Sequence, residues 1–553
     1  MKLNGARIVL EVLREQGVDT VFGYPGGTIL NIFDELYKAG DDFCHVLTAH
    51  EQGAAHAADG YARASGKVGV CLATSGPGAT NLVTGIATAY MDSVPVVAIT
   101  CNVANPMIGR DTFQEVDITG ITMPVTKHNF LVKRVGELAD TLRRAFRIAM
   151  SGRPGPVLVD IPKDVTEALC EYEPEPAQSP EPAPYPSAES LEAAAELLRN
   201  AKKPLIYVGG GAVLSGVAED FITFAEKLDA PVASTLMGLG VFPNGHPLHL
   251  GLIGMHGHFV CNKAAHDCDV LIACGARFSD RVAGNRGKFA PNAEIIHIDI
   301  DAAEMDKNIN ANYHLRGDLK EIIPALTRAV EQLDHSEWRK TLAAAGKPFL
   351  QQQLGDYVNP QQLIEAVDRA TPDDAIVVTD VGQHQLWAAQ FYHYNQPRTL
   401  LTSGGLGTMG FSLGAAIGGQ LAMPDRQVVA FVGDGGFHMN LAEMATMVAY
   451  RIPVKIFVMN NTVLGMVRQW QKFFCHNRFA DTDPHRKTDF VKTAEAFGMQ
   501  AYRITTNDEI EPVLREVFAC DGPVLVDCRI SPDSNVLPMI PPGGAHTDIV
   551  ENL

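Results

Sequence analysis

Residues 427–461 read QVVAFVGDGGFHMNLAEMATMVAYRIPVKIFVMNN and contain two short apolar runs that are typical of buried strands. The first run, Gln427–Val432, leads directly into Gly433-Asp434-Gly435, and the second, Val454–Met459, leads into Asn460-Asn461. A helical pattern joins the two runs. Strands that are apolar on both faces and connected through a helix predict a parallel β-α-β unit, and therefore the α/β class.

The ends of these two strands carry oxygen ligands. Because the carboxyl ends of parallel strands meet at one edge of a sheet, a crossover helix from about Asn440 to Ala449 places Asp434 beside Asn461. Two such ligands suit Mg²⁺ when phosphate oxygens complete its octahedron, and the glycines let backbone amides approach a phosphate. Either motif alone is more often an ordinary turn. Together, at this spacing, they resemble the binding motif of thiamin diphosphate (ThDP) enzymes.

A carboxylate in the N-terminal third matches that motif. Glu51 follows the strand-like run Phe43–Thr48 and opens the Ala-rich helical segment Gln52–Ala64. A single Glu at this position is more often a first-turn acid of a helix. Its neighbours Gly23–Gly27 and Thr74–Asn81, however, resemble the pyrimidine-binding loops of ThDP enzymes. The resemblance implies that Glu51 bonds the pyrimidine N1′ and promotes loss of the C2 proton, while the cofactor is the electron sink.

Strand-like and helical patterns alternate along the whole chain, which predicts three doubly wound parallel-sheet domains. The Pro- and Glu-rich run EYEPEPAQSPEPAPYP interrupts them and reads as an extended linker. The expected division is a pyrimidine-binding domain at 1–170, a linker at 171–188, a central FAD-binding domain at 189–345, a second linker at 346–359, a diphosphate- and Mg-binding domain at 360–532 and a C-terminal lid at 533–553.

Composition narrows the class of protein. The 553 residues include 45 Lys and Arg against 64 Asp and Glu, a net charge of −19 that disfavours nucleic acid and anionic membranes as partners. The ten cysteines show no C-x-x-C spacing, and no apolar run reaches the ~18 residues that span a bilayer. The N-terminus shows neither a signal-peptide nor a transit-peptide pattern. We therefore expect a cytoplasmic protein.

Nearly the whole chain resembles the catalytic large subunit of biosynthetic acetohydroxyacid synthase, also called acetolactate synthase. The resemblance is carried by FGYPGG, HEQGAA, TSGPGATNLVTG, FQEVD, TKHNFLV, SGRPGPVLVDIPKD, GLIGMHG, GARFSDR, DVGQHQLWAAQ, TSGGLGTMGF, LGMVRQWQ and LPMIPPGGAHTDIV. It implies decarboxylation of pyruvate and transfer of the hydroxyethyl carbanion to a second 2-ketoacid. Pyruvate as acceptor gives 2-acetolactate, and 2-ketobutyrate gives 2-aceto-2-hydroxybutyrate. This is the first common step of valine, leucine and isoleucine biosynthesis.

The resemblance also implies roles for single residues. Mg²⁺ would be bound by Asp434, Asn461 and the Val463 carbonyl, and ThDP would contact Tyr24, Pro25, Glu51, Pro77, Asn81, Gln383, His384, Gly407, Met409, Gly433, Gly435, Gly436 and Met466. Met409 would be the apolar wedge that bends the cofactor. Gln114 would hydrogen-bond the developing oxyanion, Lys163 would hold charge near the site entrance, and Phe113 and Val381 match other substrate contacts.

Two further residues would select the acceptor. Arg281 would bind its carboxylate, for which a bidentate guanidinium is well suited. Trp470 would pack against the extra methyl of 2-ketobutyrate, so we expect 2-ketobutyrate to be the preferred acceptor. Without its motif, a tryptophan is more often a core residue.

The middle third of the chain shows a weaker signal for a dinucleotide cofactor. Pro204–Val208 runs into Gly209-Gly210-Gly211, and Ile295–Ile300 ends near Asp299, but the spacing is not G-x-G-x-x-G. The family resemblance implies a structural FAD. Its contacts would be Arg153, Gly209, Gly210, Gly211, Thr235, Leu236, Met255, His256, Gly275, Arg277, Asp299 and Asp318.

The resemblance implies partners as well. Active sites in this family lie between two subunits, so Glu51 would act on a cofactor held by Asp434 and Asn461 of a second copy. A homodimer or a dimer of dimers follows, together with a small regulatory subunit.

Five positions differ from the family pattern, namely Asn102, Arg110, Ser279, Gly414 and Gly436 in place of Gln, Thr, Asp, Pro and Ser. Ser279 falls at a flavin contact, which puts FAD affinity in question, and Arg110 adds charge near Gln114. Three other functions stay open: a catabolic, flavin-free acetolactate synthase, a ThDP oxidase or decarboxylase on the same scaffold, and a cofactor-binding protein without turnover.

Overall fold

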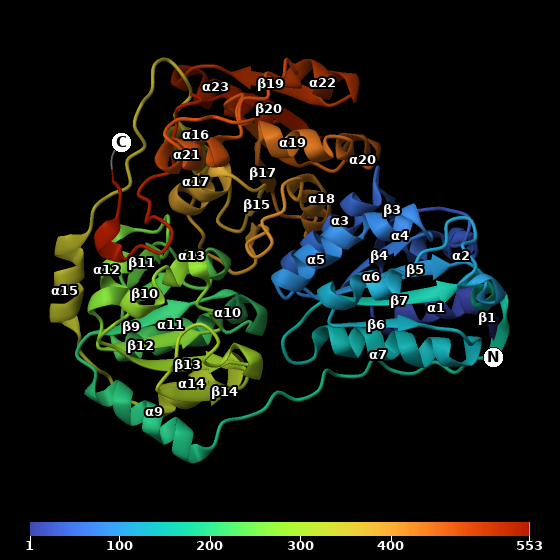
Figure 1. Cartoon of the computed structure of the whole chain (residues 1–553), viewed down its shortest axis with the longest axis horizontal. Coiled ribbons are helices and arrows are strands. Elements are labelled where there is room, and N and C mark those ends of the chain that lie inside the picture. The colour runs from blue at the N-terminus through green and yellow to red at the C-terminus, as the bar shows by residue number, and fades with distance from the viewer. Residues whose placement is uncertain (552–553) are drawn as a thin grey trace.

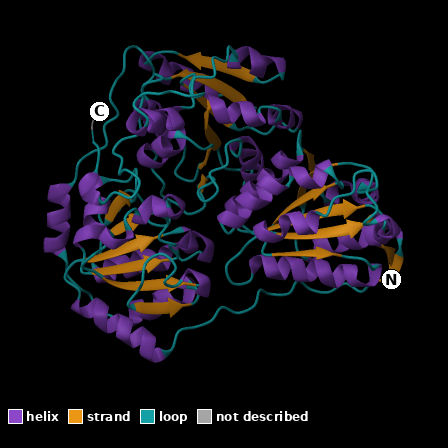
Figure 2. Cartoon of the chain, viewed as in Figure 1, coloured by secondary structure: helices purple, strands orange, loops and turns teal. Residues whose placement is uncertain are grey.

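The computed structural model describes residues 1–551 as three units, each a six-stranded parallel sheet with helices against it (Figures 1 and 2). A small antiparallel pair, β1 (Lys2–Asn4) with β8 (Leu169–Glu171), closes the first unit. The predicted α/β class with three parallel sheets is therefore confirmed. No helix among the described residues is long and apolar enough to cross a membrane.

The N-terminal sheet has the order β3-β2-β4-β5-β7-β6. Its strands are β2 (Thr20–Tyr24), β3 (Cys44–Leu47), β4 (Gly69–Ala73), β5 (Val96–Asn102), β6 (His128–Leu131) and β7 (Val157–Pro162). Its helices are α1 (Gly5–Glu15), α2 (Leu30–Ala39), α3 (Glu51–Ser65), α4 (Pro77–Asn81), α5 (Val83–Met91), α6 (Ile118–Thr122), α7 (Leu138–Met150) and α8 (Lys163–Glu167).

The central sheet has the order β11-β10-β9-β12-β13-β14. Its strands are β9 (Pro204–Val208), β10 (Val232–Ser234), β11 (His249–Leu252), β12 (Val270–Cys274), β13 (Glu294–Asp299) and β14 (Tyr313–Arg316). Its helices are α9 (Ala188–Asn200), α10 (Gly210–Ser215), α11 (Ala218–Leu228), α12 (Phe259–Asp267), α13 (Asp280–Ala283), α14 (Leu319–Ala329) and α15 (Ser336–Ala345). The order reverses between β9 and β12, as in doubly wound nucleotide-binding sheets.

The C-terminal sheet has the order β16-β15-β17-β18-β20-β19, the same permutation as the N-terminal sheet. Its strands are β15 (Ile376–Thr379), β16 (Leu400–Leu401), β17 (Val428–Gly433), β18 (Lys455–Asn460), β19 (Gln500–Ile504) and β20 (Val524–Arg529). Its helices are α16 (Pro360–Ala370), α17 (Gln383–Phe391), α18 (Ser412–Ala422), α19 (Asp434–Asn440), α20 (Glu443–Ala449), α21 (Gly465–Phe474), α22 (Phe490–Ala496) and α23 (Ile510–Phe518).

The crossover after β17 differs from its prediction. A single helix from about Asn440 to Ala449 was expected, but the backbone is helical from Asp434 and is interrupted at Leu441-Ala442 before α20 begins. Asn440, the last residue of α19, donates from Nδ2 to the carbonyl of Gly410 at 2.7 Å. The first helix of the crossover therefore starts at the proposed metal ligand itself.

Two helices join the N- and C-terminal units. Helix α3 crosses α18 so closely that a Cβ on Gly60 would collide with the backbone of Ala415, and a Cβ on Gly418 with the backbone of Ala57. Gly414, one of the departures from the family pattern, lies in the same crossing, where a Cβ would lie 2.8 Å from the carbonyl oxygen of Gly53. Small residues therefore bring the two backbones together, and one apolar core extends across both units.

The stretches 172–187 and 346–359 contain neither helix nor strand. In Figure 1 the first runs along the bottom of the molecule, from the unit at the N-terminus to α9. Both stretches fall where the sequence predicts linkers. The exact domain boundaries remain our proposal.

Candidate active site

A cavity opens at the carboxyl ends of β15, β17 and β18, on the side where the strand order reverses between β15 and β17. Eleven residues selected from the sequence line it: Val381, Gln383, His384, Met409, Gly433, Asp434, Gly435, Gly436, Asn461, Val463 and Met466. The structure thus brings together one group of predicted residues that the sequence spreads over about 85 positions.

Asp434 and Asn461 lie at the ends of the adjacent strands β17 and β18, as predicted. Burial raises the pKa of the Asp434 carboxyl to about 7, because charge is poorly solvated there. The Oδ1 atom of Asn461 accepts from the Val463 amide at 3.1 Å, and its Nδ2 donates to Gln383 at 3.1 Å. A divalent cation would favour the ionised form of Asp434, so this donor set fits Mg²⁺.

His384 is a second buried polar group at this cavity. Its Nε2 atom is buried without a hydrogen-bond partner among the described residues, and burial lowers the pKa of the imidazole to about 4. An anionic oxygen beside this nitrogen would supply the absent partner and favour the protonated, donating ring. Gln383, the preceding residue, is fixed from behind by donating to Gln469 and to the carbonyl of Ser534. Both amide protons of Gln383 are used in these two bonds, so the donors that fit a diphosphate group are the His384 nitrogen and the backbone amides at the start of α17.

The loop that carries Met409 is held by Asp380. Its carboxylate accepts from the amides of Gly410 and Ser412 at 3.0 and 3.1 Å and from the Ser412 hydroxyl at 2.8 Å. A Cβ on Gly436 would collide with the same carboxylate, so this arrangement of Asp380 requires glycine at position 436. Asp380 was not selected from the sequence, although it directly follows β15 and is the first residue of the DVGQHQLWAAQ motif.

Gly465 also lines the cavity but was not selected from the sequence. A Cβ at this position would collide with the side chain of Gln383, so the glycine lets α21 start against the cavity wall. The LGMVRQWQ motif contained this signal, but a glycine that opens a helix is usually read as a cap. Gly407, selected as a ThDP contact, has φ +71°, in the left-handed region where glycine is favoured.

Glu51 is the first residue of α3, after the N-cap His50. Its Oε2 accepts from the side-chain amide of Asn81 at 2.9 Å, and Gly78 approaches Oε1 without a Cβ. Tyr24 ends β2 and Pro77 begins α4, so the predicted pyrimidine loops, with Pro25 beside Tyr24, lie at the carboxyl ends of the N-terminal strands. The predicted grouping of these loops is present in one chain.

The two groups do not share a cavity within the chain. The residues that line the Asp434 cavity lie between positions 381 and 467, and none belongs to the N-terminal unit. Phe113, expected to contact substrate, is 87% exposed. Gln114 beside it has φ +60° and touches Gly76, while Lys163 opens α8 after β7. These N-terminal residues therefore form a second surface that is open in the single chain.

The central and C-terminal units meet at Arg281 and Trp470. The Arg281 guanidinium lies 5.6 Å from the centroid of the Trp470 ring, a cation–π distance, and also pairs with Asp280 at 3.5 Å. Trp470 lies on α21 with Met466, so the helix that lines the cofactor cavity also carries the proposed specificity residue. Sequence alone could not place these two residues in contact.

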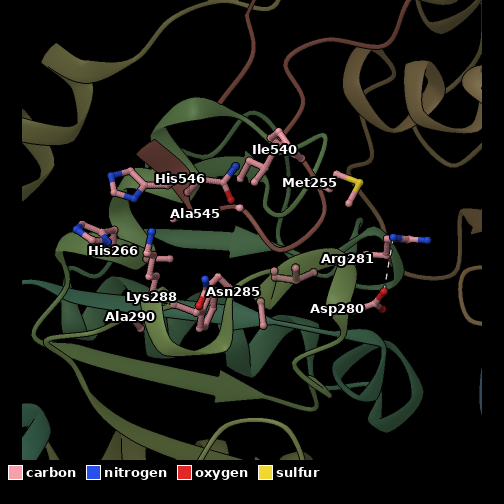
Figure 3. Close-up of a pocket in the computed structure, with 18 residues that line it drawn as sticks. Met255, His266, Asp280, Arg281, Asn285, Lys288, Ala290, Ile540, Ala545 and His546 are labelled. Carbon is pink, nitrogen blue, oxygen red and sulfur yellow. Dashed lines mark ion pairs between the residues drawn. The ribbon is translucent and has the colours of Figure 1, made fainter. Parts of the chain in front are cut away.

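A second cavity lies beside Arg281, between α12, α13 and the C-terminal segment (Figure 3). The segment is docked there by backbone hydrogen bonds from Ile540 to Met255 at 2.8 Å and from Asn285 to Gly544 at 3.2 Å. His256 lies against the Pro538 carbonyl, and burial lowers the pKa of its imidazole to about 4. The segment predicted to be a lid thus covers the edge of the central unit.

Most of the residues assigned to FAD gather at the carboxyl edge of the central sheet. Gly209 and Gly211 follow β9 and donate backbone hydrogen bonds to Cys274 and Gly275 at the end of β12, both 3.0 Å, which is the point where the strand order reverses. The others at this edge are Gly210, Thr235, Leu236, Arg277, Asp299 and Asp318. Burial raises the pKa of the Asp299 carboxyl to about 6. A ligand with hydroxyl donors would satisfy that carboxyl.

Four further positions that the sequence singled out differ in their surroundings. Arg153 pairs with Asp301 and Glu304 at 3.2 and 2.7 Å. Ser279 is the N-cap of α13 but makes no capping hydrogen bond with its side chain. Asn102 donates to Asp160 at 2.7 Å, and Arg110 is exposed in the loop before Phe113.

Three thiamine pyrophosphate enzyme models match the chain: the N-terminal TPP binding domain at 3–121, the central domain at 191–326 and the C-terminal TPP binding domain at 380–528. The fold and the cavity thus define a ThDP-dependent enzyme.

Full-length relatives narrow the class. The chain is 46% identical to the acetolactate synthase isozyme 2 large subunit of Escherichia coli (strain K12) over 553 residues, covering all of both chains. It is 46% identical to a probable acetolactate synthase large subunit of Methanocaldococcus jannaschii, covering 99% of this chain and 95% of the relative. For the large subunit of Corynebacterium glutamicum the identity is 45%, with 99% and 90% covered. The chain belongs to the family of acetolactate synthase large subunits.

Proposed function

We propose that this protein is the catalytic subunit of a biosynthetic acetolactate synthase that uses ThDP, Mg²⁺ and FAD. The observation that carries the proposal is the cavity in which Asp434, Asn461 and an unpartnered His384 nitrogen converge. The substrates are two 2-ketoacids, the first of which loses CO₂. ThDP, when bound, supplies the nucleophilic carbon and the electron sink.

The residues of the proposed site would have separate roles in binding the metal, binding the cofactor and moving the proton. Asp434, Asn461 and the Val463 carbonyl would hold Mg²⁺, and the backbone amide of Gln383 and the ring of His384 would bind diphosphate oxygens. Met409 would press on the cofactor from its loop at Gly410, which Asp380 fixes. Glu51 would hold a proton between its Oε atom and the pyrimidine N1′, oriented by the hydrogen bond from Asn81.

Arg281 and Trp470 would select the second ketoacid. The guanidinium is a bidentate donor for the acceptor carboxylate, and the indole ring 5.6 Å away offers an apolar surface for a methyl group. Gln114 would donate to the developing oxyanion, while Phe113, Val381 and Lys163 would complete the walls. The docked C-terminal segment would exclude water from the reacting carbon.

FAD in the central unit is supported by the reversed strand order at β9 and β12 and by the buried Asp299. In this proposal the flavin is structural. Because Ser279 stands where the family pattern has Asp, FAD would have one contact fewer. We therefore expect this protein to bind FAD more weakly than relatives with Asp at that position.

A homodimer is supported by the separation of the two groups in one chain. The Asp434 cavity contains no N-terminal residue, whereas Phe113 and Tyr24 are exposed at 87% and 41%. A second copy would bring its Glu51 surface against this cavity and cover these aromatic rings.

A small regulatory partner is supported by the words "large subunit" in the relatives' names. A cytoplasmic location is supported by the ten free cysteines.

The test is product analysis with purified protein, pyruvate, 2-ketobutyrate, ThDP, Mg²⁺ and FAD. Wild type should form 2-acetolactate and 2-aceto-2-hydroxybutyrate, and Glu51→Gln should lower the rate by roughly 10² or more. Glu35→Gln, which changes a buried acid on α2 away from the site, is the matched control.

Other outcomes would replace the proposal. Free acetaldehyde with CO₂ and no acetohydroxyacid would indicate a decarboxylase, and oxygen uptake would indicate an oxidase. Full activity in protein without flavin absorbance would favour the flavin-free acetolactate synthase.

A further inference from the structure

Helix α20 contacts the backbone that leads into Glu51. Figure 1 shows α20 at the edge of the C-terminal unit, facing β3 and α3 of the N-terminal unit. The Glu443 carboxylate accepts from the amide of Ala49 at 3.2 Å and from the amide of His50 at 3.1 Å. These two amides immediately precede Glu51. The helix therefore holds the chain at the base of the proposed proton-relay carboxylate.

A second side chain extends this contact. The residue after α20, Tyr450, accepts from the amide of Leu47 at 2.9 Å and donates to the carbonyl of His45 at 3.3 Å. Glu443 and Tyr450 are seven positions apart, which places them on one face of a helix. Together they bind three of the four amides from Leu47 to His50. We call these two side chains the α20 clasp.

Burial and further contacts fix the orientation of the Glu443 carboxylate. Glu443 is fully buried, and its Oε2 also accepts from the Thr446 hydroxyl at 2.7 Å. A Cβ on Gly53 would collide with the Glu443 carboxylate, so the glycine in α3 leaves room for it. A buried carboxylate with three donors has one arrangement that satisfies all of them.

The same segment begins at the cofactor cavity. Asp434 opens α19, and α20 follows after only two residues. The last residue of α19, Asn440, donates to the carbonyl of Gly410 in the loop that carries Met409. Residues 434–450 thus connect the metal ligand, the wedge loop and the segment before Glu51 in one chain.

We propose that the α20 clasp positions Glu51 and links the diphosphate cavity of each chain to that chain's own Glu51. This inference rests on the proposed dimer, in which that Glu51 would serve the other cavity. Binding of diphosphate in the cavity of one chain would then fix that chain's Glu51 carboxylate, which the other active site uses. Glu443 and Tyr450 are positioning residues and touch no substrate.

Hydrogen–deuterium exchange of the full-length protein tests the link. The probe is inorganic diphosphate with Mg²⁺, which has no pyrimidine ring and cannot touch Glu51. In wild type we expect the probe to slow exchange at Leu47, Ala49 and His50. Glu443→Gln keeps the shape but replaces one acceptor oxygen with a donor, so the Ala49 and His50 amides should exchange about tenfold faster and lose the response to the probe.

Tyr450→Phe removes the contacts to Leu47 and His45 but leaves both Glu443 contacts, so it is the milder variant. Glu35→Gln is the matched control that should behave as wild type. Wild-type exchange in Glu443→Gln would overturn the clasp, and an unchanged response to diphosphate would overturn the link. The positioning role also requires kcat to fall roughly tenfold in Glu443→Gln with KM for pyruvate nearly unchanged.

These outcomes are distinct from failure of the proposed function. If wild type forms no acetohydroxyacid, the proposed function fails, while exchange at the three amides still decides whether the clasp exists. Faster exchange in Glu443→Gln without any change in kcat would overturn the positioning role.

Discussion

At the residue scale, the molecule buries several carboxyls whose ionisation is unfavourable, and they fall into two kinds. Asp434 and Asp299 face the proposed cofactor sites, and burial raises the pKa of their carboxyls to about 7 and about 6. Asp160 is different, because it is enclosed by Thr100 and Asn102 inside the N-terminal sheet. A raised pKa is therefore a pointer to a ligand only where a cavity adjoins it.

Asp160 gives a prediction for stability. Burial raises the pKa of its carboxyl to about 6, above the value in an unfolded chain, so the folded state binds more protons between about pH 4 and 6. The cost of the charged form is present above pH 6 and is relieved as the pH falls. Asp160→Asn should thus raise the melting temperature relative to wild type at pH 7.5, and the difference should shrink by pH 5. Calorimetry at the two pH values measures it; a constant difference would contradict the assignment.

Trp470 gives a prediction for specificity. If the indole packs against the extra methyl of 2-ketobutyrate, Trp470→Ala should lower the preference for 2-ketobutyrate over pyruvate by about 10- to 100-fold, since a methyl contact is worth ~1–3 kcal/mol. Competition between the two acceptors and quantification of both products measures the ratio. Trp338→Phe, a change to a buried tryptophan of the central unit, is the control. An unchanged product ratio in Trp470→Ala would remove this residue from the acceptor pocket.

At the element scale, helices begin where the chemistry is placed. Glu51 opens α3, Asp434 opens α19 and Gln383 opens α17. Each follows a strand end or a short loop after it, so the sheet edge fixes the position and the helix start exposes the side chain. Sequence patterns predicted only the start at Glu51, where a strand-like run leads into an Ala-rich helical pattern; the helix after Asp434 was expected to begin near Asn440, and the start at Gln383 was not predicted.

The crossing of α3 and α18 gives a prediction for folding. Gly418→Ala would place a methyl group into the Ala57 carbonyl, so the helices must separate, at a cost of about 1–3 kcal/mol or more. Gly419→Ala on the same helix meets only the end of a Leu401 side chain at 3.0 Å and should cost much less. Thermal unfolding of both variants measures the difference. Equal losses would show that helix propensity, not the crossing, decides stability.

Contacts between distant elements were beyond the sequence. Nothing in the patterns around Glu443 indicates that it binds the amides before Glu51, and the DVGQHQLWAAQ motif does not show that Asp380 binds the loop that carries Met409. Arg281 and Trp470 were selected through family resemblance, but their contact depends on how two units dock. The periodicity of apolar residues and the composition of a segment indicate its local structure, whereas contacts between distant residues depend on tertiary packing.

At the scale of the whole molecule, the separation of the two site halves gives a sharp prediction. Glu51→Gln and Asp434→Asn should each be nearly inactive alone. After mixing, dissociation and reassociation, heterodimers should contain one site with both native residues, which restores about a quarter of wild-type activity when subunits pair at random. If both residues served one site within a single chain, mixing would restore nothing. Size-exclusion chromatography of the mixture confirms that dimers have re-formed.

The N- and C-terminal units share one strand order, and their crossing helices are equivalent in it: α3 and α18 each follow the second strand of their sheet. The two close contacts, Gly60 with Ala415 and Gly418 with Ala57, exchange glycine and alanine between the helices, and one sequence offset relates both pairs. Such reciprocity is the mark of a twofold axis. The N- and C-terminal units of one chain therefore meet about a pseudo-twofold axis, as the two copies of a homodimer would. In a true homodimer one substitution would alter both contacts at once, whereas in this chain a substitution alters one contact and leaves its symmetry mate unchanged.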